Sequence, residues 1–181
     1  MEYNNAYGNT ALHTAIRAGH VDIVSLLLEK GCDVNARNHI GSTPLHLCAY
    51  MTNPVDDVET KPKELLNTVV GLKVDKPSVM VQSYMQIAAI ILSNDTFTMI
   101  NEKDNNGYTA LHIAAQRGCD DMVKLLINAG ADLSVKTDID IKGRGGRTAK
   151  DTAKFSGQVK TYNLLNEMEL EMKRVNKTQD R

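Results

Sequence analysis

Several ingredients of catalytic and membrane proteins are scarce in this sequence. It has no Trp, and Tyr and Phe together make up 4% of its 181 residues, so aliphatic side chains and Met must fill the core. No apolar run approaches the roughly 20 residues that a helix needs to cross a bilayer. The first residues, MEYNNAYGN, lack the basic start and apolar stretch of a signal peptide. We therefore expect no membrane contact and a cytoplasmic, intracellular protein, with the nucleus and delivery into a host cell left open.

Charge and cysteine give equally little sign of chemistry. The formal net charge is −1, so no global field favours nucleic acid or an anionic membrane. Cys32, Cys48 and Cys119 form an odd count without a C-x-x-C pair, which is typical of free thiols in a reducing compartment. A zinc site needs clustered ligands at short spacing, and the sequence has none. We expect no metal, no other cofactor and no small-molecule substrate.

The sequence does contain an internal repeat. The stretch GNTALHTAIRAGHVDIVSLLLEKGCDVNAR at 8–37 returns as GYTALHIAAQRGCDDMVKLLINAGADLSVK at 107–136. The copies align on threonines, of which the first two are 33 residues apart and the third follows 66 residues later. These threonines are Thr10, Thr43, Thr109 and Thr148. A fixed period of this length indicates one supersecondary unit copied along the chain.

Each copy predicts a turn, a short helix, a loop, a longer helix and an extended exit. A glycine opens the turn, and the threonine that follows is a good N-cap for the short helix. The longer helix carries apolar residues at i, i+3 and i+4, which we take as the stripe that faces neighbouring units. This stripe is Ile23, Leu26 and Leu27 in the first copy and Met122, Leu125 and Leu126 in the third. Stacked pairs bury such stripes, so the pattern predicts a solenoid.

The pattern resembles the ankyrin repeat. GNTALH, GSTPLH and GYTALH carry the resemblance, with LLLEKGCDVNA and LLINAGADLSV, and it covers roughly 5–51 and 84–170. It implies an all-α solenoid of about four stacked helix pairs with projecting hairpin turns. We expect one domain over 1–170 and a C-terminal tail at 171–181. The expected repeats are 5–37, 38–103 with an insertion, 104–137, and 138–170 as a C-terminal cap.

The second repeat is interrupted after Tyr50. We interpret 52–83 as an insertion, and a decayed extra repeat over 71–103 stays open as the alternative. A long helix is predicted from about 76 to 92, with the apolar stripe Met80, Tyr84, Ile87 and Ile91. Within the insertion, Leu65, Leu66, Val69 and Val70 stand at helical spacing. Such a patch must be buried on the stack or in a partner's site.

Three histidines stand at the same position of their repeats, and this argues for a structural role. They are His13, His46 and His112, each three residues after Thr10, Thr43 or Thr109. We expect each imidazole to bind the backbone of a turn and fasten neighbouring units. Stacked units hold them roughly 10 Å apart, too far to share a metal. His46 and Cys48, at i and i+2 of a helix, do not face each other as base and nucleophile, so we expect no enzyme.

The resemblance implies a non-catalytic scaffold or adaptor that binds another protein through its concave face, its hairpin tips and the insertion. Tyr and Arg, which are favoured at interface hot spots, occur among the positions that do not contribute to the core. These positions are Tyr7, Asn9, Arg17, His39, Ile40, Tyr50, Met51, Asn105, Asn106, Tyr108, Gln116 and Arg117. We expect a monomer.

Two alternatives stay open. One is a pathogen effector that uses the repeats to bind a host protein. The other is contact with nucleic acid or an acidic partner through the basic loop 142–150, which contains KGRGGR. That loop lacks the G-K-[ST] ending of a phosphate-binding P-loop and the interleaved aromatic residues that stack on bases, so nucleic acid is the less favoured partner.

Overall fold

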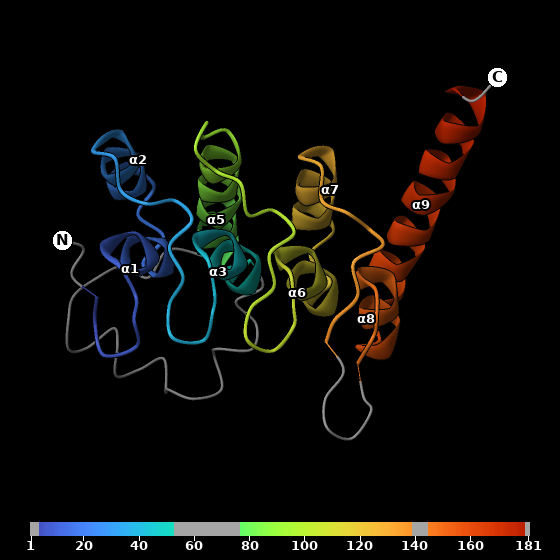
Figure 1. Cartoon of the computed structure of the whole chain (residues 1–181), viewed down its shortest axis with the longest axis horizontal. Coiled ribbons are helices and arrows are strands. Elements are labelled where there is room, and N and C mark those ends of the chain that lie inside the picture. The colour runs from blue at the N-terminus through green and yellow to red at the C-terminus, as the bar shows by residue number, and fades with distance from the viewer. Residues whose placement is uncertain (1–3, 53–76, 139–144, 180–181) are drawn as a thin grey trace.

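The computed structural model describes residues 4–52, 77–138 and 145–179, and within these ranges every regular element is an α-helix. Figure 1 shows the helices in two rows, with α1, α3, α6 and α8 below and α2, α5, α7 and α9 above. The bounds are α1 Ala11–Arg17, α2 Val21–Glu29, α3 Pro44–Met51, α5 Pro77–Leu92, α6 Ala110–Arg117, α7 Asp120–Asn128, α8 Ala149–Phe155 and α9 Val159–Gln179. Long loops join each upper helix to the next lower one. The predicted all-α solenoid is confirmed.

The four short helices begin in the same way. A threonine is the N-cap of each, and its hydroxyl accepts a hydrogen bond from the backbone N–H three residues later. The side chain at that third position accepts a bond from the threonine's own N–H in return, which completes a capping box. Histidine fills this position in α1, α3 and α6, whereas Asp151 fills it in α8. Side-chain caps of this kind stabilise a helix by about 1 kcal/mol relative to Ala.

Small residues of the lower row and aliphatic residues of the upper row form the core. Ala114 and Ala115 in α6 and Cys48 and Ala49 in α3 are fully buried. Each short helix contacts the next: α1 packs on α3, α3 on α6 and α6 on α8. Their small side chains let these helices approach one another closely, so the lower row forms the continuous spine of the stack.

The long helix α5 belongs to α3 in space although residues 53–76 separate them in the sequence. It packs on α3 and also lies against α2 and α7. The predicted stripe is buried at Tyr84, Ile87 and Ile91 and half-buried at Met80. The Tyr84 hydroxyl donates to the backbone oxygen of Arg17 at 3.2 Å. The apolar patch expected at 65–70 lies outside the described residues, and the choice between an insertion and a decayed repeat stays a prediction.

The apolar stripe predicted for the first longer helix is wrong at Ile23 and Leu26, whereas Leu27 packs on the core. In α2 the side chain of Val24 is fully buried, whereas Ile23 is 42% and Leu26 is 52% exposed. In α7 the buried residues are Met122, Val123, Leu126 and Ile127, and Leu125 is only half-buried. The core-facing stripe therefore includes the residues next to those expected. Ile23 is more exposed than its counterpart Met122. The helix α7 lies against α5, the helix before it in the upper row, whereas α2 is the first described helix of that row.

The exposed end of the row has an apolar hollow. Its lining includes Ala11, Ala15, Ile23 and Leu27 from α1 and α2, and Ala18 at the C-cap of α1. In the third unit, Ala110, Ala114, Met122 and Leu126 stand at the positions of four of these residues and are at most 1% exposed. The first unit therefore presents residues of interior type at the end of the stack.

The last helix continues through most of the expected tail 171–181. It runs from Val159 to Gln179 and projects beyond the other helices (Figure 1). No Gly or Pro interrupts this stretch, and Lys173 pairs with Glu169 one turn earlier at 2.9 Å. Leu165 is buried, and Leu164 and Met168 pack on the core. The side chains of 171–174 in α9 are exposed.

Candidate protein-interaction surface

Each repeat histidine links its own helix to the next loop. The Nδ1 atoms of His13, His46 and His112 lie 2.9, 2.7 and 2.7 Å from the hydroxyl of the N-cap threonine. Their Nε2 atoms lie 3.1, 3.0 and 2.9 Å from backbone oxygens of the following loop. These oxygens belong to Ser42, Tyr108 and Arg147. The three imidazoles thus form a ladder along the stack.

The ladder fixes the protonation of the rings. A backbone oxygen can only accept, so Nε2 carries the proton and donates it, and Nδ1 accepts from the threonine hydroxyl. Burial lowers the pKa of His46 and His112 below the usual 6.5, although the hydrogen bonds to Tyr108 and Arg147 partly oppose this shift. Burial thus favours the neutral form of His46 and His112, and both ring nitrogens of each are engaged in hydrogen bonds within the chain.

The hairpin loops are built by their own side chains. Oδ1 of Asn5 accepts from the backbone N–H groups of Tyr7 and Asn9, and Asn38 and Asp104 do the same in the next two loops. Neighbouring loops are joined by backbone bonds from His39 to the oxygen of Tyr7 at 3.1 Å and from Asn105 to the oxygen of Ile40 at 3.0 Å. The turns therefore form a rigid series with outward-pointing tips.

Most of the tip residues named from the sequence are exposed, with one correction. Tyr7 is 72% and Ile40 is 56% exposed, and His39, Asn105 and Asn106 are exposed as well. Asn9 is only 5% exposed, and its Oδ1 accepts a hydrogen bond from Nδ2 of Asn38 at 2.9 Å. Asn9 was predicted to be free for a partner, but it fastens two adjacent loops.

The ends of the short helices hold the other predicted positions. Tyr50, in the last turn of α3, is 48% exposed, and the Arg117 guanidinium at the end of α6 lies 4.3 Å from its ring centroid. Arg17 and Gln116 are exposed on α1 and α6. Two further positions are less accessible than expected: Met51 packs on the core, and the half-buried Tyr108 ring meets His112 edge-on at 6.1 Å between centroids. We call the surface formed by the loop tips and these helix ends the interaction face.

The interaction face also includes two residues that the sequence analysis missed. Phe155 ends α8, is 72% exposed and has the Arg147 guanidinium 3.8 Å from its ring centroid. Phe155 stands seven residues after its N-cap Thr148, the same offset as Arg17, Tyr50 and Gln116 from theirs. That periodicity could have revealed it.

Of the basic loop, residues 142–144 lie outside the described ranges, while Lys150 pairs with Glu169 of α9.

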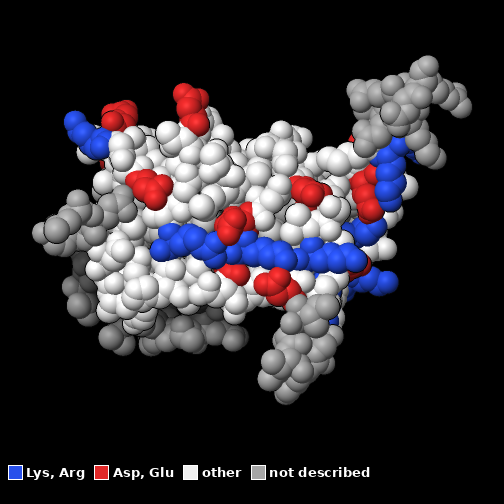
Figure 2. Space-filling view, viewed as in Figure 1, with Lys and Arg blue, Asp and Glu red and all other residues white. Residues whose placement is uncertain are grey.

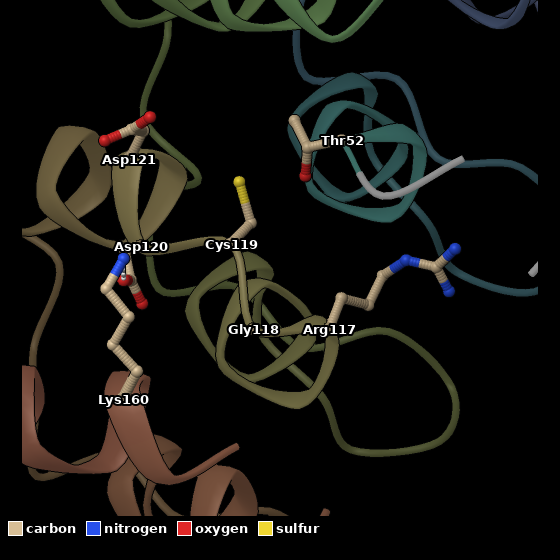
Figure 3. A pocket seen from close by; sticks show the side chains of 7 residues that line it. All are labelled: Thr52, Arg117, Gly118, Cys119, Asp120, Asp121 and Lys160. Atoms are coloured by element: carbon tan, nitrogen blue, oxygen red, sulfur yellow. Dashed lines mark ion pairs between the residues drawn. The ribbon is translucent and has the colours of Figure 1, made fainter. Parts of the chain in front are cut away.

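A polar hollow lies where α3, α6, α7 and α9 meet. Its lining is Thr52, Arg117, Gly118, Cys119, Asp120, Asp121 and Lys160. Figure 3 shows Lys160 reaching from α9 toward Asp120 at the start of α7, with Arg117 pointing away from this pair. The distances to Asp120 are 2.8 Å from Nζ of Lys160 and 2.7 Å from the Thr161 hydroxyl. Burial alone would raise the pKa of Asp120, but these hydrogen bonds outweigh burial and lower the pKa. The same contacts join the start of α7 to α9.

Charged side chains join the loops on the face seen in Figure 2. A band of Lys and Arg crosses this face, with acidic side chains on both sides of it. Arg37 pairs with Glu102 and donates to the backbone oxygen of Lys103 at 2.8 Å, and Lys103 pairs with Asp138 at 2.7 Å. These contacts link successive loops. Arg37 and Lys103 are thus neutralised by contacts within the chain.

Cys32, Cys48 and Cys119 are free thiols, and burial raises the pKa of Cys48. Across 4–52, 77–138 and 145–179, no three His, Cys, Asp or Glu side chains gather as metal ligands would. None of the helices in those ranges is long and apolar enough to cross a bilayer.

Comparison with known proteins found relatives of greater length. The chain is 27% identical over 167 residues to transcription factor MBP1 of Kluyveromyces lactis, covering 79% of the chain and 22% of that protein. It is 30% identical over 172 residues to the probable E3 ubiquitin-protein ligase XBOS33 of Oryza sativa subsp. japonica, covering 71% and 33%. It is 30% identical over 137 residues to NF-kappa-B inhibitor alpha of Sus scrofa, covering 75% and 35%. The chain thus spans about a fifth to a third of these proteins.

Two protein-family models match the chain directly. Ankyrin repeats in three copies match residues 1–60, and a single ankyrin repeat matches 106–138, together more than half of the chain. The matches fall on the units whose capped helices and histidine ladder are described above. The chain belongs to the ankyrin-repeat family, whose helical solenoid is a protein-interaction fold.

Proposed function

We propose that the chain is a non-catalytic scaffold that binds a partner protein along the interaction face. One observation carries the proposal: Tyr7, Ile40, Tyr50 and Phe155 are between 48% and 72% exposed on loop tips and short-helix ends. Exposed apolar residues that gather on one rigid surface mark interaction sites, and aromatic residues and Arg dominate interface energetics. The residues that build the loops and caps beneath them are occupied by internal hydrogen bonds.

The setting proposed with this function is the cytoplasm of a cell. Three free cysteines, one of them fully buried, suit a reducing compartment. We propose a monomer that engages one partner chain.

The test is affinity capture with quantitative mass spectrometry. We expect the double variant Tyr7→Ala/Tyr50→Ala to lose the proteins that the wild type captures, because both rings lie on the interaction face. The matched control is Ile23→Ala/Leu26→Ala, which removes two apolar side chains of similar exposure (42% and 52%) from α2. Circular dichroism would verify that both variants fold. Loss in the control but not in the Tyr variant would move the site to the upper row of helices.

A further inference from the structure

We infer that the projecting part of α9 binds an amphipathic helix of a partner protein, one that carries basic residues beside its apolar stripe. This surface lies outside the interaction face, so the inference goes beyond the proposed function. It starts from the lengths of two neighbouring helices of the upper row. The 21 residues of α9 span about 32 Å, whereas the 9 residues of α7 span about 14 Å. Figure 1 shows α9 continuing above the end of α7.

One apolar stripe runs along α9 from the core into the projecting part. Leu165, Met168 and Met172 stand at i, i+3 and i+7, which places them on one face of the helix in heptad spacing. Leu165 is 1% exposed and Met168 packs on the core, whereas Met172 is 42% exposed. In the sequence, Val175 occupies the next position of the same spacing. The stripe that is buried in the first half of α9 therefore continues beyond the core.

The contacts of the first half of α9 indicate what fits the second. The helices α7 and α8 pack on α9 in the stack. The stripe continues that established interface in the same spacing, so a further helix can pack on it as α7 and α8 do. Residues 170–179 of α9 span about 15 Å, and a helix laid along them needs about three turns. Apolar residues in heptad spacing on that helix would interlock with the stripe.

The charges beside the stripe define which helix is complementary. Lys173 pairs with Glu169 at 2.9 Å, and Arg174 is likewise engaged within the chain. Glu167 and Glu171 stand one turn apart on α9, and both are exposed. Neither forms an ion pair within the parts of the chain that the structure describes. The charge left beside the stripe is acidic, so the complementary helix is basic.

The experiment measures fluorescence anisotropy of labelled helical peptides titrated with the full chain. The probe has three heptads, with Leu at the two core positions, Lys at the flanking positions and Ala elsewhere, because shorter helices are marginal in water. Its counterpart has Glu in place of Lys. We expect saturable binding of the Lys peptide and weaker binding of the Glu peptide. Raising the salt from about 50 to about 500 mM should weaken binding of the Lys peptide, because it screens the attraction to α9.

The variants separate the stripe from the rest of α9. We expect Met172→Glu to lower the affinity for the Lys peptide about tenfold or more, and Met172→Ala to lower it less. Glu171→Gln should lower it about two- to fivefold, as expected for an exposed ion pair. The matched control is Leu170→Glu, because Leu170 is 48% exposed but stands two residues from Met172 and so faces another side of α9. Circular dichroism would verify that each variant folds.

The remaining outcomes overturn the inference. Absence of binding, equal affinity for the Glu peptide, or equal loss in Leu170→Glu and Met172→Glu would each rule out recognition of a basic helix by this stripe. Light scattering behind size-exclusion chromatography tests a different occupant. A dimer of the wild type that Met172→Glu dissociates would assign the stripe to a second copy of the chain.

Discussion

Leu26 and Leu126 have the same chemistry and opposite surroundings. Leu126 is fully buried between α7 and its neighbours, whereas Leu26 is 52% exposed on α2. We predict that Leu126→Ala lowers the free energy of unfolding by about 2–5 kcal/mol, because it removes buried methyl groups and leaves a cavity. Leu26→Ala should change it by no more than about 0.5 kcal/mol. Urea unfolding monitored by circular dichroism measures both, and equal losses would contradict the burial described here.

The histidine ladder makes stability depend on pH. Because burial lowers the pKa of His46 and His112 in the folded chain, the unfolded chain binds more protons than the folded chain once the pH falls below about 6.5. We predict that the melting temperature is constant near pH 7.5 and falls as the pH is lowered through 6.5 toward 5.5. Thermal melts at fixed ionic strength measure this.

The control for that prediction is the double variant His46→Gln/His112→Gln. Its melting temperature should already be lower at pH 7.5, because Gln cannot bridge a threonine and the next loop with the same geometry. Its further loss between pH 7.5 and 5.5 should be smaller than that of the wild type. Parallel curves for the two proteins would show that other groups cause the pH dependence.

At the scale of the helix, the joint between α7 and α9 decides how the last element is held. The Thr161 side chain is 1% exposed and donates to Asp120 at 2.7 Å. We predict that Thr161→Val, which keeps the shape and removes the donor, costs about 1–3 kcal/mol and speeds amide hydrogen exchange in α9. Lys160→Ala should have little effect, because the Lys160 side chain is 91% exposed. Uniform exchange changes in both variants would argue against this joint.

The helices that begin at a threonine cap could be read from the sequence, because Gly, Thr and His recur at fixed offsets that each satisfy local hydrogen bonds. The buried face of α2 could not be read from the sequence, because the burial of Ile23 depends on whether another helix pair packs beside it and not on the pattern of its own helix. The end of α9 could not be placed from the sequence because no Gly or Pro stops the helix after residue 170. Phe155 was missed because the polar residues of α8 were interpreted as a cap, which hid its repeat position.

At the scale of the whole molecule, residues 53–76 separate α3 from α5, yet these helices pack directly on each other. We predict that replacing 54–74 with a short Gly/Ser linker preserves cooperative unfolding, because the entropic cost of closing a flexible loop changes by only about 0.6 kcal/mol per twofold change in its length. Helix content and the sharpness of the thermal transition measure this. A Gly/Ser linker of the original length is the control, and loss of cooperativity in both would show that the replaced sequence itself stabilises the stack.

The apolar hollow at the α1–α2 end offers a surface on which a further helix pair could pack. Ala11, Ala15 and Leu27 occupy positions whose third-unit counterparts are buried against the preceding helices. The stability of such a stack is approximately the sum of the stabilities of its units and of the interfaces between neighbouring units. An added unit that buries this apolar hollow would therefore contribute a further interface. A helix pair grafted there in the register of 110–128 would meet a surface already matched to it. The length of the interaction face then becomes a quantity that protein engineering can increase one unit at a time.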